Sequence, residues 1–472
     1  MKLTKLFENL LKMICDLLAR WGVYYCRRRE LLSPVITVNG ALVRPREILV
    51  DIAYEAEIAD RLRELGGRPY VPSGDEDDWR QHPLLPHFGD VNAQLDEARL
   101  RCHLWVGFST RRAVALVRKR ELPGVHFNSV YLLGAVESVA VGRGDRGGTG
   151  YYQGGPVGYA APFSGPLRFP PHLNTSTVEV EVLDTGMPAN WKTDYKALAN
   201  TVTEVKVGTV VKSDPLGVGN VVESHGAHGL FICGLIARQH PMLDIRSRRV
   251  MSPSGEVDDT IASPTITNSL GAVINLSFSG ETPNGNVSFA MGNAVAAAVQ
   301  KDQVLVAAAG NDGGHDPSSS FHNRKVWPAA HPDVIAVGAF DSTNQNPGPS
   351  PVPPPPPVLP QWTNQAEIYA PGVNLLSMHA IGWTRPQGYP LDPYQGWAMW
   401  SGTSVATPVV AAEIAKAIID ANAGNPGGIT RRQAAADWLA KQPKSSTWPD
   451  KPPAAPGVFG KQMDPAPRLT SW

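Results

Sequence analysis

The sequence predicts an α/β protein whose larger domain is a doubly wound, mainly parallel sheet, preceded by a small α+β domain of ferredoxin-like plan. The first observation is a set of short, almost continuously apolar segments, among them Ala272–Leu276, Val304–Ala308 and Val334–Gly338. The second is the alternation of these segments with helical patterns at His228–Arg238 and Val287–Gln300. Apolar strands separated by helices are typical of a parallel sheet covered on both faces.

Composition excludes several classes of partner. The 472 residues have room for two or three domains, and 43 basic side chains balance 43 acidic ones. This balance gives no bulk charge that would favour nucleic acid, so none is expected as a partner. The four cysteines, at positions 15, 26, 102 and 233, lack metal-ligand spacing. Composition therefore indicates neither a metal nor a cofactor.

An amphipathic helix is predicted within residues 1–33, because leucine and isoleucine recur there at helical spacing. Lys5, Glu8, Lys12 and Asp16 interrupt the apolar core that a secretory signal requires. Two interpretations stay open: a helix packed on this protein or on a partner, and an anchor lying at a membrane surface. We expect a cytoplasmic protein, since no export signal is evident.

Residues 46–140 predict a small α+β domain. The pattern gives a strand, a helix, two strands, a helix and a final strand, at 47–53, 55–65, 68–71, 100–108, 110–119 and 125–133. This is the ferredoxin-like order. Residues 141–172 are rich in Gly and Pro, which is linker composition.

The remaining segments are less informative. The larger domain is expected at 173–442, with further strands at Val178–Leu183, Asp244–Val250 and Val373–Ser377. A proline-rich insert at 344–360 predicts extended polyproline II conformation in a surface loop. A helix is expected at Thr430–Lys441, followed by an irregular tail at 443–472.

Four segments carry polar residues suited to nucleophilic catalysis. Asp184 ends the strand at 178–183, and His228 opens an apolar helix. Asn311 follows the strand at 304–308, and Ser404 lies at the start of a long alanine-rich helix. Serine is a weak nucleophile without an adjacent base, and a helix N-terminus favours negative charge. The order Asp, His, Ser is one of the known chain orders of a catalytic triad.

With these segments in view, the chain resembles the subtilisin-like (subtilase) serine peptidases. The matching motifs are Leu183-Asp-Thr-Gly, His228-Gly with Gly234 six residues later, Ala309-Gly-Asn-Asp-Gly and Gly402-Thr-Ser-Val-Ala-Thr-Pro. The resemblance covers residues 170 to 425, roughly one large domain. It implies a serine endopeptidase acting on protein or peptide substrates without a cofactor.

The resemblance also implies the roles of individual residues. Ser404 is expected to attack the peptide carbonyl, His228 to transfer the proton, Asp184 to orient the imidazole, and Asn311 to bind the oxyanion. The residues expected to hold a substrate are Ser277, Phe278, Ser279, Gly280, Ala308, Ala309, Gly310, Asp312 and Val326. The helix after His228 runs into Arg238 without the Asn-rich loop that binds calcium in many subtilases. No such metal site is expected.

The N-terminal domain has two interpretations. Its plan resembles the propeptide that precedes subtilase catalytic domains, which assists folding, inhibits the enzyme and is cut off. Autocleavage would then be expected within 141–172. The alternative is a fused domain for binding or regulation that is never cleaved.

Two histidines compete for the role of base. His225 matches a local His-Gly-x-His form, whereas His228 alone has the glycine six residues downstream that the helix requires. We therefore assign the role to His228 and treat His225 as a polar loop residue.

Two other functions compete with the peptidase. Asp184-Thr185-Gly186 is also a signature of aspartic peptidases, but these need a second such segment, and the chain has none. A catalytically silent binding or scaffold protein remains the alternative from another class.

Overall fold

The computed structural model describes residues 35–72, 90–120, 122–133, 178–205, 216–218, 221–222, 225–311, 313, 325–341, 359–360, 363–384, 393–424 and 428–442, together with three short strands at 23–24, 161–162 and 461–462. We call residues 35–133 the N-terminal domain and residues 178–442 the main domain.

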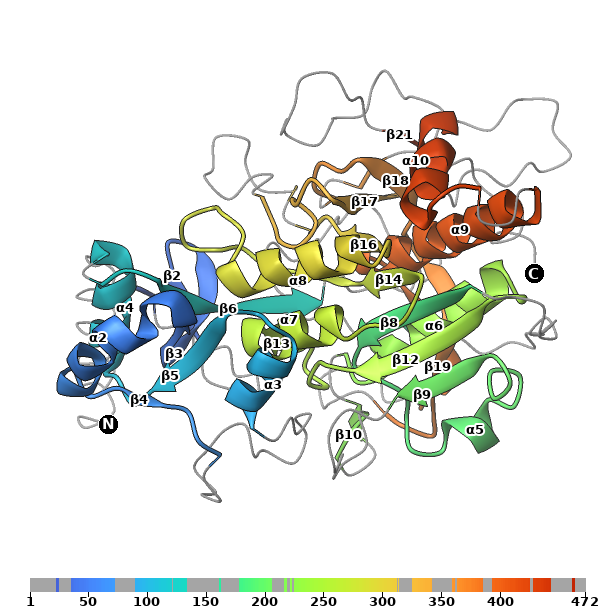
Figure 1. Ribbon diagram of the computed structural model, residues 1–472. Coiled ribbons are helices and arrows are strands. Elements are labelled where there is room, and N and C mark those ends of the chain that lie inside the picture. The colour runs from blue at the N-terminus through green and yellow to red at the C-terminus, as the bar shows by residue number, and fades with distance from the viewer. Residues whose placement is uncertain are drawn as a thin grey trace, which may run out of the picture.

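The main domain is built on one parallel sheet (Figure 1). Its strands in spatial order are β9 (Val202–Val205), β12 (Asp244–Arg249), β8 (Glu179–Asp184), β14 (Val273–Leu276), β16 (Val304–Ala308), β17 (Val334–Phe340), β18 (Ile368–Pro371) and β21 (Lys461–Gln462). All neighbouring pairs are parallel. The predicted doubly wound sheet is confirmed.

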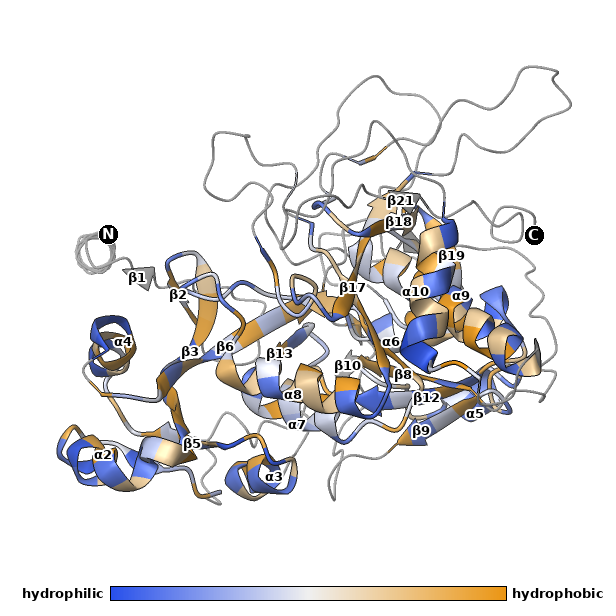
Figure 2. Ribbon diagram, turned by 45° about the horizontal axis from the view of Figure 1, so that its top comes forward, coloured by the Kyte–Doolittle hydropathy of each residue, from blue (hydrophilic) through white to orange (hydrophobic). Residues whose placement is uncertain are grey.

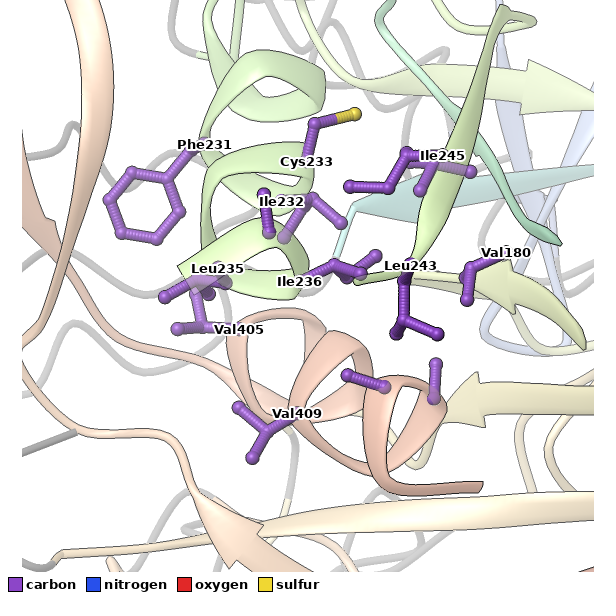
Figure 3. Packing of buried hydrophobic residues seen from close by; sticks show 14 of the residues in the cluster. Val180, Phe231, Ile232, Cys233, Leu235, Ile236, Leu243, Ile245, Val405 and Val409 are labelled. Atoms are coloured by element: carbon purple, nitrogen blue, oxygen red, sulfur yellow. The ribbon is translucent and has the colours of Figure 1, made fainter. Parts of the chain in front are cut away.

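Helices cover both faces of this sheet because its central strands β14, β16 and β17 are buried on both sides. On one face lie α6 (His228–Gln239), α9 (Thr403–Gly424) and α10 (Arg431–Lys441), and on the other lie α7 (Asp259–Thr267) and α8 (Phe289–Gln300). Figure 3 shows the core on the face that α6 and α9 cover. Ile232 and Ile236 of α6 lie close to Ile245 and Leu243 there, with Val405 of α9 nearby. Figure 2 shows the apolar character of β17.

The N-terminal domain has the predicted order of elements, with additions. It contains β2 (Ile36–Val38), β3 (Ala41–Asp51), α2 (Ile52–Glu64), β4 (Arg68–Pro69), α3 (Val91–Glu97), β5 (Cys102–Val106), α4 (Thr110–Lys119) and β6 (Val125–Leu133). The core strands lie in the order β4-β5-β3-β6 and pair antiparallel. This order confirms the α+β domain of ferredoxin-like plan.

The two domains are joined by pairing between their strands and by a common buried core. Strand β6 pairs antiparallel with β13 (Glu256–Asp258) and β15 (Phe278–Ser279) of the main domain. Leu95 and Leu104 belong to the same buried cluster as residues of α7 and α8. In Figure 1, these two helices lie between the blue N-terminal domain and the main sheet.

Three details differ from the prediction. The segment at 373–377 does not join the main sheet: β19 (Leu375–Ile381) pairs with β20 (Gln395–Trp400) and, beyond it, β7 (Ala161–Pro162) in an antiparallel sheet. Helix α7 was not predicted, because it contains Pro264 and three threonines, which have low helix propensity. The tail, expected to be irregular, contributes β21.

Several predictions fall outside the described residues. These are most of the helix at 1–33, whose residues 23–24 form the strand β1 instead, most of the linker at 141–172, the insert at 344–360 apart from its last two residues, and most of the tail. Small elements that complete the described chain are β1 (Val23–Tyr24), α5 (Trp191–Asp194), β10 (Gly217–Val218) and β11 (Val221–Val222). Of the helices that the structure describes, none has both the length and the apolar character needed to cross a membrane.

Candidate active site

Asp184 occupies the last position of β8, at the carboxyl end of the sheet. Its side chain is fully buried, and its Oδ1 accepts a hydrogen bond of 2.7 Å from the Thr185 backbone N–H. Gly186 follows with a φ of 87°, a left-handed conformation that glycine adopts without strain. This turn ends the strand and leaves the carboxylate at the sheet edge, where functional groups of such sheets collect.

His228 is the first residue of α6 and lies against Asp184. Its Nδ1 is 2.9 Å from Asp184 Oδ2 and 3.0 Å from Oδ1. The next residue, Gly229, donates its backbone N–H to Thr185 Oγ1 at 2.9 Å. A Cβ at position 229 would lie 2.6 Å from the Gly186 carbonyl oxygen, so only glycine allows α6 to begin this close to β8. The histidine is thereby held at a fixed distance from the aspartate.

Ser404 is the second residue of α9 and completes a chain of three side chains. His228 Nε2 lies 3.1 Å from Ser404 Oγ, and both residues are fully buried. Ser277 Oγ donates to the Ser404 backbone carbonyl at 2.8 Å, which ties the start of α9 to the end of β14. The structure therefore brings Asp184, His228 and Ser404 into one continuous hydrogen-bonded arrangement.

His225 lies nearby but has different contacts. Its ring stacks on Trp400, with centroids 5.9 Å apart, and hydrogen-bonds the Ser254 backbone. Burial, and then the neighbouring His228, lower the pKa of His225 to about 3. It is therefore neutral at ordinary pH, and the histidine between Asp184 and Ser404 is His228.

Asn311 follows β16 and faces the start of α9. Its Oδ1 accepts a 3.0 Å hydrogen bond from the Thr403 backbone N–H, while Thr403 Oγ1 accepts one of 3.2 Å from Gly310 N–H. Because the carbonyl end of the amide is engaged, its NH₂ end is the group available to donate. The first N–H groups of a helix have no intrahelical acceptor. The site thus combines an amide donor with a helix N-terminus beside Ser404.

A family model matches this architecture. The model of the subtilase family, Peptidase S8, matches residues 175–437, which is more than half of the chain. The chain belongs to the subtilase family.

Individual relatives support the same assignment. Subtilisin E of Bacillus subtilis is 34% identical over 139 residues, which are 29% of this chain and 28% of that protein. Subtilisin DY of Bacillus licheniformis is 29% identical over 248 residues, covering 50% of this chain and 74% of that protein. The chain thus matches less than a third of the length of subtilisin E, and most of the length of subtilisin DY.

One solved structure has a similar fold. Fervidolysin from Fervidobacterium pennivorans, described as a keratinolytic enzyme related to subtilisin, has a TM-score of 0.54 and 17% identity. The match covers 89% of this chain and 60% of that one. At this identity the likeness shows the fold alone.

The residues predicted to bind a substrate in this subtilase lie in two groups. Ser277, Phe278, Ser279 and Gly280 form and flank β15, and Gly280 pairs with Trp327 through two hydrogen bonds. The second group, Ala308, Ala309, Gly310 and Val326, surrounds the start of the Asn311 turn. Val326 is buried, and its Cγ2 lies 3.3 Å from where a Cβ of Gly310 would be. Asp312 lies outside the described residues.

The structure adds a strand that was not predicted, β13, which offers an extended chain a second edge opposite β15. Strand β13 lies opposite β15, and β6 of the N-terminal domain runs between them. Leu132 pairs with Ser279 on one side and with Glu256 on the other. Strand β13 has only three residues and follows Ser254-Gly255. Three residues are too few for an alternating pattern to indicate a strand. Phe278, which was expected to hold a substrate, is therefore paired with Leu133 of this subtilase's own chain.

Trp400 is a further neighbour of the Asp184–His228–Ser404 arrangement, and the sequence pattern did not predict it. Its fully buried ring meets His228 edge-on, with centroids 5.0 Å apart and planes at 74°. It also contacts Phe231 of α6. Among the described residues, no group of three or more His, Cys, Asp or Glu side chains is placed to hold a metal ion.

Proposed function

We propose that this subtilase is a serine endopeptidase that hydrolyses peptide bonds through Asp184, His228 and Ser404. The observation that carries the proposal is the hydrogen-bonded arrangement from the Asp184 carboxylate through His228 to Ser404 Oγ. Ser404 Oγ bonds to the substrate carbonyl carbon, and its proton moves to His228 Nε2. Asp184 stabilises the imidazolium through Nδ1.

The charge on the former carbonyl oxygen is stabilised by two donors. These are the Asn311 amide and the Ser404 backbone N–H at the positive end of α9. Collapse of the intermediate releases the amine with the proton from His228 and leaves an acyl-enzyme. Water then attacks this ester by the same route and frees Ser404. The buried Val326 beside Gly310 favours small or medium side chains on the acyl residue of the substrate.

The N-terminal domain acts as an inhibitor in this proposal. Its strand β6 occupies both edges, β13 and β15, with which an extended substrate would pair. Its sheet is anchored by a buried core shared with α7 and α8. A buried ion pair between Arg44 of β3 and Asp258 of β13 adds a polar anchor at 2.8 Å. The domain and a substrate therefore exclude one another.

The first test is reaction with a small fluorophosphonate that labels activated serines. We expect the wild-type chain to be labelled and Ser404→Ala to stay unlabelled, because the arrangement activates one hydroxyl. Ser401→Ala is the matched control: this serine hydrogen-bonds Asn374, and its loss should leave labelling intact. If the wild type and a chain whose domain contact is weakened by Arg44→Met both stay unlabelled, a silent binding protein is favoured.

Self-processing is tested by intact-mass measurement. In antiparallel register, Leu133 pairs with Phe278, so the next residue of an extended chain would meet Ser277, which contacts Ser404. We therefore expect the wild type to cut close to the end of β6, ahead of the 141–172 range that composition suggested. Ser404→Ala should keep its full mass. A wild-type chain that remains uncut after long incubation would contradict self-processing, and a cut within 141–172 would contradict the register.

A further inference from the structure

Tyr131 of β6 occupies a buried site made by the main domain. It pairs with Val257 of β13, and its side chain is fully buried. The ring contacts Phe278 of β15, with centroids 6.0 Å apart. Since the main domain encloses this side chain, withdrawal of β6 leaves a recess between β13 and β15. We call the residues around it, Asp259, Phe278, Gly280 and Ser288, the Tyr131 site.

The polar end of the Tyr131 site is a buried carboxylate. The Tyr131 hydroxyl donates to Asp259 Oδ1 at 2.6 Å and lies 3.4 Å from Ser288 Oγ. Ser288 Oγ in turn donates to the same carboxylate oxygen at 2.6 Å. Asp259 is the first residue of α7 and Ser288 is the N-cap of α8, so two helix starts fix both groups.

The walls of the Tyr131 site suit an aromatic ring. A Cβ at Gly280 would lie 2.8 Å from Tyr131 Cδ1, closer than real contacts allow, so glycine gives the ring its room. Burial raises the pKa of Asp259 to about 6, so the carboxylate is ionised at pH 7.5 and accepts hydrogen bonds. A flat apolar slot that ends in a fixed acceptor matches a phenol better than a flexible alkylammonium chain.

Resting on the proposed function, we propose that Asp259 is a specificity-determining residue that selects a tyrosine in substrates. A substrate that replaces β6 in the same register places one side chain in the Tyr131 site and, three residues later, a residue opposite Ser277 beside Ser404. The selected tyrosine is thus the fourth residue before the bond that is cut. A phenylalanine there would remove the 2.6 Å hydrogen bond that Asp259 Oδ1 accepts from the phenol, and losing a hydrogen bond to a buried carboxylate is costly.

The test uses the full chain and peptidyl diphenyl phosphonates of sequence acetyl-X-Leu-Leu-Ala, with X as Tyr, Phe or Lys. Ser404 Oγ bonds to phosphorus and a phenol leaves with the transferred proton, so labelling rates report binding along the edge. Each probe reacts only after the same withdrawal of β6. The probes are used at concentrations where the labelling rate rises linearly with concentration, so withdrawal does not limit the rate and its equilibrium cancels in the ratios. We expect the Tyr probe to label Ser404 about tenfold to hundredfold faster than the Phe probe.

Variants of Asp259 separate this role from general packing. Asp259→Asn keeps the shape and a neutral acceptor, and should reduce the ratio of the Tyr to the Phe rate several-fold. Asp259→Ala should bring the ratio close to one. Glu281→Gln, which neutralises a nearby main-domain carboxylate outside the Tyr131 site, is the matched control and should leave the ratio unchanged.

The outcomes distinguish this inference from the proposed function. Equal rates for the Tyr and Phe probes, or a faster Lys probe, would overturn the selection of tyrosine while peptidase chemistry stands. If a small fluorophosphonate labels Ser404 but none of the peptidyl probes does, substrates do not follow this register and the inference fails. If the small reagent also fails, the peptidase proposal itself is lost.

Discussion

Replacing His228 by alanine is expected to lower kcat by about 10⁶-fold, a magnitude carried over from the corresponding substitution in subtilisin. The reason is geometric: His228 Nε2 is 3.1 Å from Ser404 Oγ, and its Nδ1 is held by Asp184. Without the imidazole, the serine proton has no acceptor and the amine has no donor. Hydrolysis of a fluorogenic peptide measures the loss, with and without His228→Ala in chains that both carry Arg44→Met, so that access to the site does not depend on self-processing.

His225 provides the matched control for this substitution. It lies three residues earlier and is equally buried, with its ring centroid 6.1 Å from that of His228. Its ring stacks on Trp400, and burial keeps its pKa near 3, so it carries no proton to donate at neutral pH. His225→Asn should retain most of the activity. If His225→Asn abolished turnover while His228→Ala spared it, the two assignments would have to be exchanged.

The positions of the proposed catalytic residues were predictable because each lies at the end of a locally recognisable element. Val304–Ala308 is apolar throughout and ends where the turn to Asn311 begins, and the helix that Ser404 opens is alanine-rich along its length. Such elements are specified by neighbouring residues, so their positions agree with the pattern within two residues. Parallel pairing then gathers the strand ends at one edge of the sheet.

The second edge and the Tyr131 site could not be predicted in the same way. Strand β13 exists because Val257 pairs with Tyr131, which lies more than a hundred residues earlier in the chain. Helix α7 is stabilised by burial and by its Asp258 N-cap despite Pro264 in its interior. In both cases tertiary contacts outweigh local propensity. A single sequence offers no signal for which distant residues will meet.

Removing the buried charge of Arg44 should open the N-terminal domain. Arg44 Nε lies 2.8 Å from Asp258 Oδ2, and the two side chains are 1% and 0% exposed. Breaking a buried pair from one side costs about 3–5 kcal/mol, because the remaining charge stays desolvated. Arg44→Met should therefore weaken closure, and the rate at which peptidyl phosphonates label Ser404 should rise about 100-fold or more. Hydrogen exchange at the β6 amides should increase in parallel.

Two further variants decide whether this effect comes from the buried pair. Arg61→Met makes the same change in an exposed ion pair. The Arg61 and Glu64 side chains are 59% and 64% exposed, and such pairs contribute less than about 1 kcal/mol to stability. Its labelling rate should match the wild type. Adding Asp258→Asn to Arg44→Met removes the buried negative charge that has lost Arg44 and should restore part of the closure. Equal opening by Arg44→Met and Arg61→Met would instead mean that closure depends on the apolar core around α7 and α8 alone.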